Sequence, residues 1–128
     1  MNRFRSILGL VVGVLMILSA GAHSLLGWKL MRAELDALHA SGELIGGLEL
    51  GWKFGGVSML TFGCIVLTLF ARRLRGGDVS MLPANVIGAT YVVYGAGALL
   101  ASRLDPFFLV FAVPGVLLLI ASIPQRPA

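Results

Sequence analysis

The chain alternates long apolar segments with short polar stretches. The apolar segments lie at about residues 7–26, 51–70, 82–102 and 106–123. Each is close to the ~20 residues that a helix needs to cross the hydrocarbon core of a bilayer. We therefore predict an all-α integral membrane protein with four transmembrane helices in an antiparallel up-down bundle. Residues 1–128 are expected to form this single domain, because the connections are too short to hold a soluble catalytic domain.

The connection between the first two apolar segments has a helical pattern of its own. Met31, Leu35 and Leu38 recur at helical spacing, and charged residues occupy positions between them. This pattern predicts an amphipathic outer segment between helices one and two. The segment either extends helix one beyond the membrane or lies along the membrane surface, and a break is expected at Ser41 and Gly42.

Turn and capping residues predict the other helix ends. The second helix is expected to start as early as Leu44 and to run to Arg72. Residues 103–105 form a short link before the fourth helix, with Asp105 placed to cap that helix and Pro106 at its first position. A link this short predicts that the third and fourth helices are antiparallel neighbours.

The positive charges gather on one side of the expected membrane. An even number of crossings brings together the ends that hold Arg3, Arg5, Arg72, Arg73, Arg75 and Arg126. By the positive-inside rule this side is cytoplasmic, which places both termini in the cytoplasm. We expect a protein of the bacterial inner (plasma) membrane whose net charge of +4 contacts membrane lipids, and no nucleic-acid partner.

The first apolar segment also has the layout of a secretion signal. Arg3 and Arg5 precede it, and Ala20, Gly21 and Ala22 resemble the small residues of a cleavage site. We expect the segment to be retained as an uncleaved signal anchor that forms the first helix.

Small residues recur at a spacing that favours helix packing. Membrane helices associate where small side chains let two backbones approach closely. One such face holds Gly47, Gly51, Gly55 and Ser58 on the second helix, and Gly9 and Gly13 repeat the spacing on the first. We expect these faces to pack against protein. The contact is formed either within one chain or between chains.

Several polar and aromatic side chains are expected at the outer membrane boundary. His23 lies 18 residues beyond Arg5 and Lys53 lies 19 before Arg72, which corresponds to about 27–29 Å of helix. The candidate binding residues at this level are His23, Glu49, Lys53, Trp28, Trp52 and Arg103. In the alternative interpretation, Lys53 only pairs with Glu49, the tryptophans anchor the helices at the boundary, and His23 donates a hydrogen bond to a neighbouring helix.

Two tyrosines define a second candidate site, near the middle of the third helix. Tyr91 and Tyr94 are three residues apart and share a helix face. They are expected either to line a pocket for a lipid, a quinone or a pigment, or to form hydrogen bonds between helices. A haem ligated by His23 is a less favoured alternative.

Few residues offer reactive chemistry. The only cysteine, Cys64, excludes an internal disulfide and a four-thiolate metal site within one chain, and it is expected to be a small core residue. No metal ligands are predicted. No nucleophile has a matching base, so no catalytic residue is predicted either.

Together these patterns favour a non-catalytic subunit or assembly partner of a larger membrane complex. The first alternative is a homo-oligomeric carrier of a small solute, an ion or a lipid, with its polar site on the outer face. The second alternative is a lipid- or quinone-active membrane enzyme. The expected partners are membrane lipids and either other membrane subunits or further copies of this chain.

Overall fold

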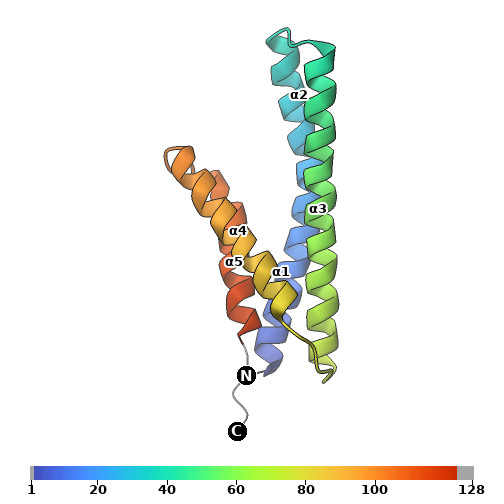
Figure 1. Ribbon diagram of the computed structural model, residues 1–128, viewed down its shortest axis with the longest axis vertical. Coiled ribbons are helices and arrows are strands. Elements are labelled where there is room, and N and C mark those ends of the chain that lie inside the picture. Colours follow the sequence, from blue (N-terminus) through green and yellow to red (C-terminus); the bar gives the residue numbers. More distant parts are fainter. Residues whose placement is uncertain (1, 124–128) are drawn as a thin grey trace.

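All regular elements of the computed structural model, which describes residues 2–123, are helical (Figure 1). In chain order they are α1 (Asn2–Ala22), the π-helical turn η1 (His23–Gly27), α2 (Trp28–Ala37), α3 (Gly42–Leu74), α4 (Leu82–Ala101), the 3-10 turn η2 (Pro106–Phe108) and α5 (Leu109–Ser122). The prediction of an all-α chain is confirmed for these residues.

Three helices are long and apolar enough to cross a membrane. They span Arg3–Ala37, Gly42–Leu74 and Leu82–Ala101, and the apolar helix Pro106–Ser122 is shorter. The shorter helix starts as predicted, because the Asp105 carboxylate accepts the Phe107 backbone N–H at 2.9 Å. A membrane location is therefore supported, and the fourth crossing stays a prediction.

The amphipathic outer segment extends the first helix. Helix α1, the turn η1 and helix α2 follow one another without a break, and at ~1.5 Å per residue they measure about 54 Å. Helix α3 measures about 50 Å, against about 30 Å for a hydrocarbon core. Ser41 caps α3 by accepting the Leu44 N–H at 3.2 Å, so the break lies where the sequence predicts it.

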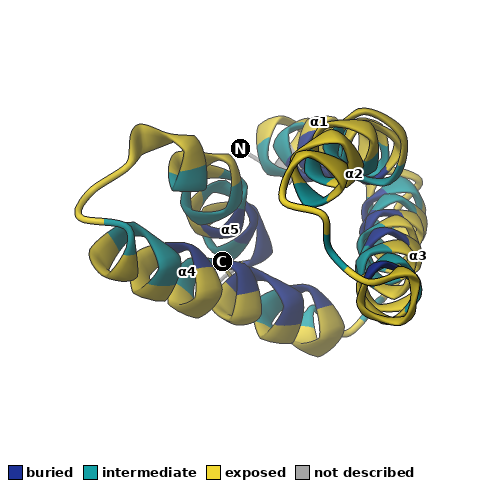
Figure 2. Cartoon of the chain, turned by 90° about the horizontal axis from the view of Figure 1, so that it is seen from above, coloured by how far each residue is buried: buried dark blue, intermediate teal, exposed yellow. Residues whose placement is uncertain are grey.

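The helices pair into two hairpins that diverge like the arms of a V (Figures 1 and 2). Helix α1 packs along α3, and α4 packs along α5. The antiparallel pairing of the last two helices is thus confirmed. The two hairpins touch over only part of their length, however, whereas an up-down bundle packs along its whole length.

The buried core lies at the closed end of the V, where α1, α3, α4 and α5 meet. It consists of Val12, Met16, Val66, Phe70, Ala84, Ile87, Tyr91, Leu118 and Ala121. Both described chain ends lie at this end of the molecule (Figure 1). Burial of apolar side chains between the hairpins is therefore concentrated in one half of the protein.

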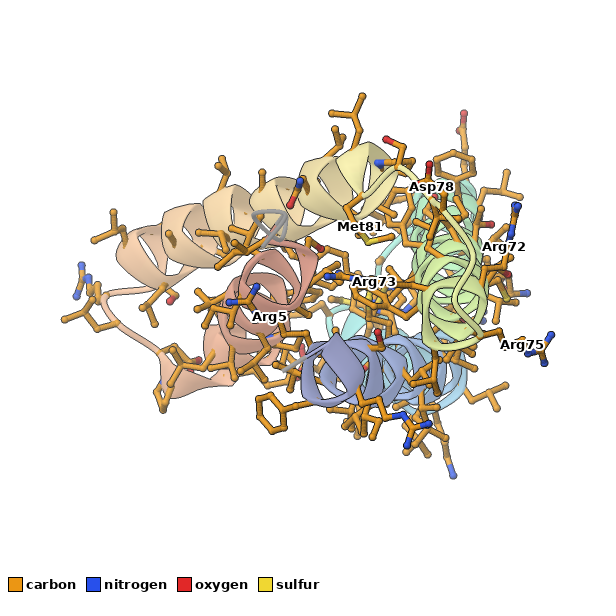
Figure 3. The ribbon with its side chains drawn as sticks, turned by 90° about the horizontal axis from the view of Figure 1, so that it is seen from below. Arg5, Arg72, Arg73, Arg75, Asp78 and Met81 are labelled. Carbon is orange, nitrogen blue, oxygen red and sulfur yellow. The ribbon has the colours of Figure 1, made fainter. Side chains whose placement is uncertain are left out.

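Two arginines tie the hairpins together at the closed end. Arg73 of α3 donates to the Ala121 carbonyl at 2.9 Å, and Arg5 of α1 donates to the Ile123 carbonyl at 3.4 Å. The carbonyls in the last turn of a helix lack partners within that helix, and its negative dipole end attracts cations. Figure 3 shows Arg73 pointing between the helices, while Arg72 and Arg75 point outward.

Each hairpin is closely packed at glycines. A Cβ atom added at Gly63 of α3 would lie 2.7 Å from Ile17 Cγ1 and 3.1 Å from the Gly13 carbonyl oxygen of α1. At Gly115 of α5, an added Cβ would lie 2.8 Å from the Val92 nitrogen of α4. Both positions need glycine because a larger side chain would push two backbones apart.

Replacing Gly63 by leucine should therefore weaken the first hairpin. We expect Gly63→Leu to lower the free energy of unfolding by about 1–3 kcal/mol, because the added side chain overpacks the α1–α3 contact. Gly21→Leu is the matched control, since an added Cβ at Gly21 meets no atom within 4 Å. Thermal unfolding in mild detergent, followed by circular dichroism, measures both; equal stability of the two variants would contradict the contact.

Candidate functional site

His23 and Trp52 form a reciprocal contact between the first helix and α3. The His23 ring donates from Nε2 to the Trp52 carbonyl at 3.1 Å, and the Trp52 indole donates to the His23 carbonyl at 2.7 Å. The two rings stack in parallel, with 4.5 Å between their centroids and 3° between their planes. Each residue thus satisfies polar atoms of the other.

The backbone around His23 is shaped for this contact. The turn η1 is π-helical, and the Trp28 N–H also donates to the His23 carbonyl. Single π-helical turns inside α-helices often occur at functional sites. A Cβ added at Gly27 would lie 2.9 Å from Trp52 Cζ2, so glycine at this position leaves room for the indole. A hydrogen bond from His23 to a neighbouring helix was one of the alternatives expected from the sequence, but the π-helical turn and the partner, Trp52, were not predicted.

The expected grouping of His23 with Lys53 does not form among the described residues. Lys53 instead forms a salt bridge with Glu49, one turn away on the same helix, and its side chain is 58% exposed. Consecutive residues of a helix point about 100° apart, so Trp52 faces α1 while Lys53 faces elsewhere. His23 and Lys53 were expected at the same depth in the membrane, but residue counting does not show in which direction each side chain points.

The remaining outer candidates divide between the two hairpins. Trp28 lies near the His23/Trp52 pair, with its ring 6.3 Å from that of Trp52 and tilted by 50°. Arg103 lies in the turn between α4 and α5, at the open end of the V (Figures 1 and 2). The structure therefore brings together His23, Trp28 and Trp52, and separates Arg103 from them.

A cleft of about 300 Å³ lies where the hairpins diverge. It is lined by His23, Gly55, Met59 and Phe62 on one side and by Thr90, Tyr91, Tyr94 and Phe111 on the other. His23 and the two tyrosines, which the sequence placed at different depths, thus share one cleft. The apolar pattern gives no signal for Met59, Phe62 or Phe111, because cleft-lining and lipid-facing apolar residues look alike in a membrane helix.

Tyr91 is the most buried polar residue of this cleft. Its side chain lies between Phe62 and Phe111, with ring centroids 6.5 and 6.0 Å away. The residue is 7% exposed, and its hydroxyl oxygen has no hydrogen-bond partner within the part of the chain that the structure describes. Tyr94, in contrast, is 57% exposed and meets Phe111 edge-on at 5.0 Å.

The glycine face of α3 is partly open within the chain. Gly47 and Gly51 are exposed, and a Cβ added at either would meet no atom within 4 Å. At Gly55 an added Cβ would lie 3.2 Å from His23 Nε2, while the Ser58 hydroxyl donates to the Phe54 carbonyl of its own helix. On α1, Gly9 and Gly13 lie against α3, where Phe70 and Leu67 face them.

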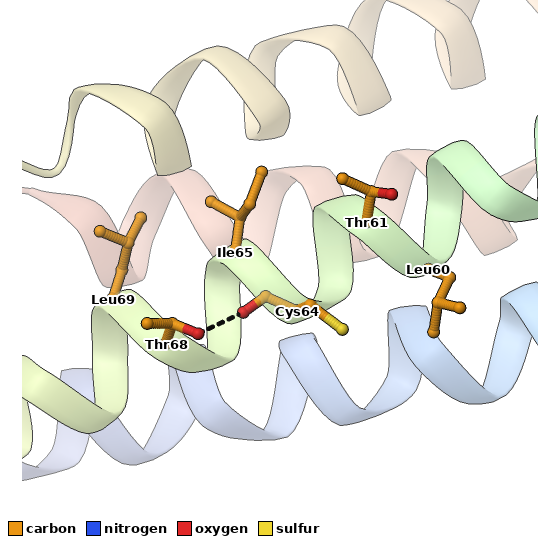
Figure 4. A pocket seen from close by; sticks show the side chains of 6 residues that line it. All are labelled: Leu60, Thr61, Cys64, Ile65, Thr68 and Leu69. Carbon is orange, nitrogen blue, oxygen red and sulfur yellow. Dashed lines mark hydrogen bonds between the residues drawn. The ribbon is translucent and has the colours of Figure 1, made fainter.

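Cys64 is exposed, so its prediction as a core residue is wrong. It lines a surface groove of about 480 Å³ with Leu60, Thr61, Ile65, Thr68 and Leu69 (Figure 4). All six residues belong to α3, so no second element encloses the groove. The Thr68 hydroxyl donates to the Cys64 carbonyl at 2.8 Å, within the same helix.

In residues 2–123, no three His, Cys, Asp or Glu residues are grouped so that they could hold a metal ion.

Comparisons of the whole chain with known proteins give no relatives. No protein-family model, no curated protein and no solved structure matches it.

The His23/Trp52 pair predicts unequal roles for the two tryptophans. We expect Trp52→Phe to lower the free energy of unfolding by about 1–2 kcal/mol, because phenylalanine keeps a ring on His23 but cannot donate to its carbonyl. Trp28→Phe should cost less, since its ring is only tilted toward Trp52. Chemical unfolding in mixed micelles measures both variants. A larger loss for Trp28→Phe would contradict the described geometry.

Proposed function

We propose that this chain is a non-catalytic subunit or assembly partner of a larger membrane complex. In this proposal it crosses an inner (plasma) membrane four times and has both termini in the cytoplasm. The main support is the glycine face of α3: a Cβ added at its outer members, Gly47 and Gly51, would meet no atom of the described residues within 4 Å.

The open glycines continue a face that is packed lower down the same helix. Gly51, Phe62 and Leu69 point in similar directions, because separations of 11 and 18 residues are close to whole numbers of turns. Phe62 and Leu69 pack against the core, where the hairpins meet. Helix α4 diverges from α3 toward the open end of the V (Figure 1), and a Cβ added at Gly51 would meet no atom of the described residues within 4 Å.

A transmembrane helix of another protein would suit this free face. Lipid tails pack against leucine as well as against glycine, so a lipid-facing helix gains nothing from small residues. A second helix does gain from them, because its backbone can approach closely and its contact area increases. The homo-oligomeric carrier stays the alternative function, since a second copy of this chain could cover the same residues.

The arginines at the closed end support the proposed orientation. Arg72 and Arg75 point outward from the end of α3 (Figure 3), where they can reach anionic lipid headgroups. The opposite end of the long hairpin carries both charge signs, including the Arg32–Asp36 ion pair. The excess of arginine at one end is the pattern that the positive-inside rule associates with the cytoplasm.

Association should depend on the free glycine face. We expect the wild-type chain to copurify with a stoichiometric membrane partner, and Gly47→Leu combined with Gly51→Leu to reduce that partner at least about tenfold. Gly46→Leu is the matched control, because Gly46 also meets no atom within 4 Å but points to another side of α3. Native mass spectrometry after gentle extraction from the source membrane measures the complex. A wild-type chain found alone, or only with its own copies, would overturn the subunit proposal.

Accessibility of single cysteines tests the orientation. In a Cys64→Ala background, we expect a membrane-impermeant maleimide to label Ala37→Cys in intact cells but Asp78→Cys only after permeabilisation. Both positions are exposed, at opposite ends of the α1–α3 hairpin. The reverse pattern would contradict the cytoplasmic placement of the termini.

A further inference from the structure

We propose that the partner's transmembrane helix continues beyond the membrane for at least two turns and packs there on α3, against Leu44 and Leu48. The inference rests on the proposed function, because it concerns the same partner that Gly47 and Gly51 are proposed to bind. Three observations lead to it: the exposure of these leucines, the packing of the same helix face lower down, and the short length of α4.

The leucines lie in the part of α3 that we expect at or beyond the membrane boundary. Apart from the two arginines in its last turn, every charged residue of α3 lies at or before Lys53. Charged side chains are costly inside hydrocarbon, so the boundary should fall close to Lys53. Leu44 and Leu48 precede it and are 52% and 43% exposed. In contact with water, burial of such side chains against protein is favourable.

The outer hairpin segment, residues 28–50, has almost no core of its own. All of these residues are described, and Ile45 is the only buried one among them. Helical propensity alone stabilises short helices only marginally in water, so most of their stability comes from packing of an apolar face. A third helix on the leucines would supply that packing.

The face that carries the leucines packs against the second hairpin lower down. Positions 18 residues, or about five turns, further along α3 point in the same direction, and these are Phe62 for Leu44 and Val66 for Leu48. Val66 is fully buried, and the ring of Phe62 meets that of Tyr91 on α4 edge-on at 6.5 Å. The outer leucines thus continue, at the same spacing, a face that already accepts helices.

The second hairpin is too short to cover the leucines. Helix α4 starts at the closed end of the V, where α3 ends, and it has 20 residues against 33 in α3 (Figure 1). At ~1.5 Å per residue it is about 20 Å shorter than α3. A helix of the partner fits better, because a helix that lies on Gly51 reaches Leu44 after seven more residues, or about 10 Å.

The test measures whether Leu44 is covered in the source membrane. In a Cys64→Ala background, Leu44→Cys and Gly46→Cys place single thiols at nearly the same depth, about 160° apart around α3. Gly46 is the matched control, because a Cβ added there meets no atom within 4 Å. A water-soluble maleimide is added to membranes opened by freezing and thawing, so the result does not depend on orientation. We expect Leu44→Cys to react at least about fivefold more slowly, since packed contacts exclude water and reagent.

The purified chain in phosphatidylcholine vesicles provides the comparison without a partner. There the two cysteines should react within about twofold of each other, because no partner contact excludes the reagent. Protection of Leu44→Cys that persists in these vesicles would assign the cover to lipid and overturn the proposal.

The outcomes separate this inference from the proposed function. Equal labelling rates in the source membrane would overturn the inference alone if a stoichiometric partner still copurified and was lost in the variant with leucine at Gly47 and Gly51. Equal rates without any partner would overturn both. Protection within a complex that native mass spectrometry shows to hold only copies of this chain would also overturn both.

Discussion

The close approach of two backbones within each hairpin is the constraint on which this structure depends. In lipid, helices gain little by hiding apolar surface from one another, so small residues largely decide which surfaces meet. Here they lie inside the hairpins, at Gly63 between α1 and α3 and at Gly115 between α5 and α4. The hairpins meet each other through larger side chains and through the Arg73 contact with the Ala121 carbonyl, at one end only. A V results.

The candidate site follows from this unequal packing. Where the arms part, Tyr91 is still enclosed by Phe62 and Phe111, but Tyr94, three residues further along α4, is exposed. The cleft is therefore closed at Tyr91 and open at Tyr94, and the two residues are less than one helical turn apart. The His23/Trp52 pair fixes the α1–α3 side of this opening, since two hydrogen bonds and a ring stack hold it.

Local signals predicted much of the secondary structure, because caps act over a few residues. Asp105 caps the helix it was expected to cap, the break predicted at Ser41 and Gly42 is present, and the long apolar segments are helical. The site was harder to predict. Counting residues gives the depth of His23 but not its direction, so its pairing with Trp52 and the exposure of Cys64 were missed. Both depend on how one helix is rotated against the next, which only packing between distant residues determines.

The length of the first hairpin has a mechanical consequence. If the hairpin stands upright with its lower end at one face of the hydrocarbon core, about 20 Å of paired helix extends beyond the opposite face of that core. The Arg32–Asp36 ion pair, whose two side chains are about half exposed, belongs to that outer part. A stiff, hydrated stalk of this kind reaches past the headgroups, so a soluble protein could touch its tip without entering the lipid at all.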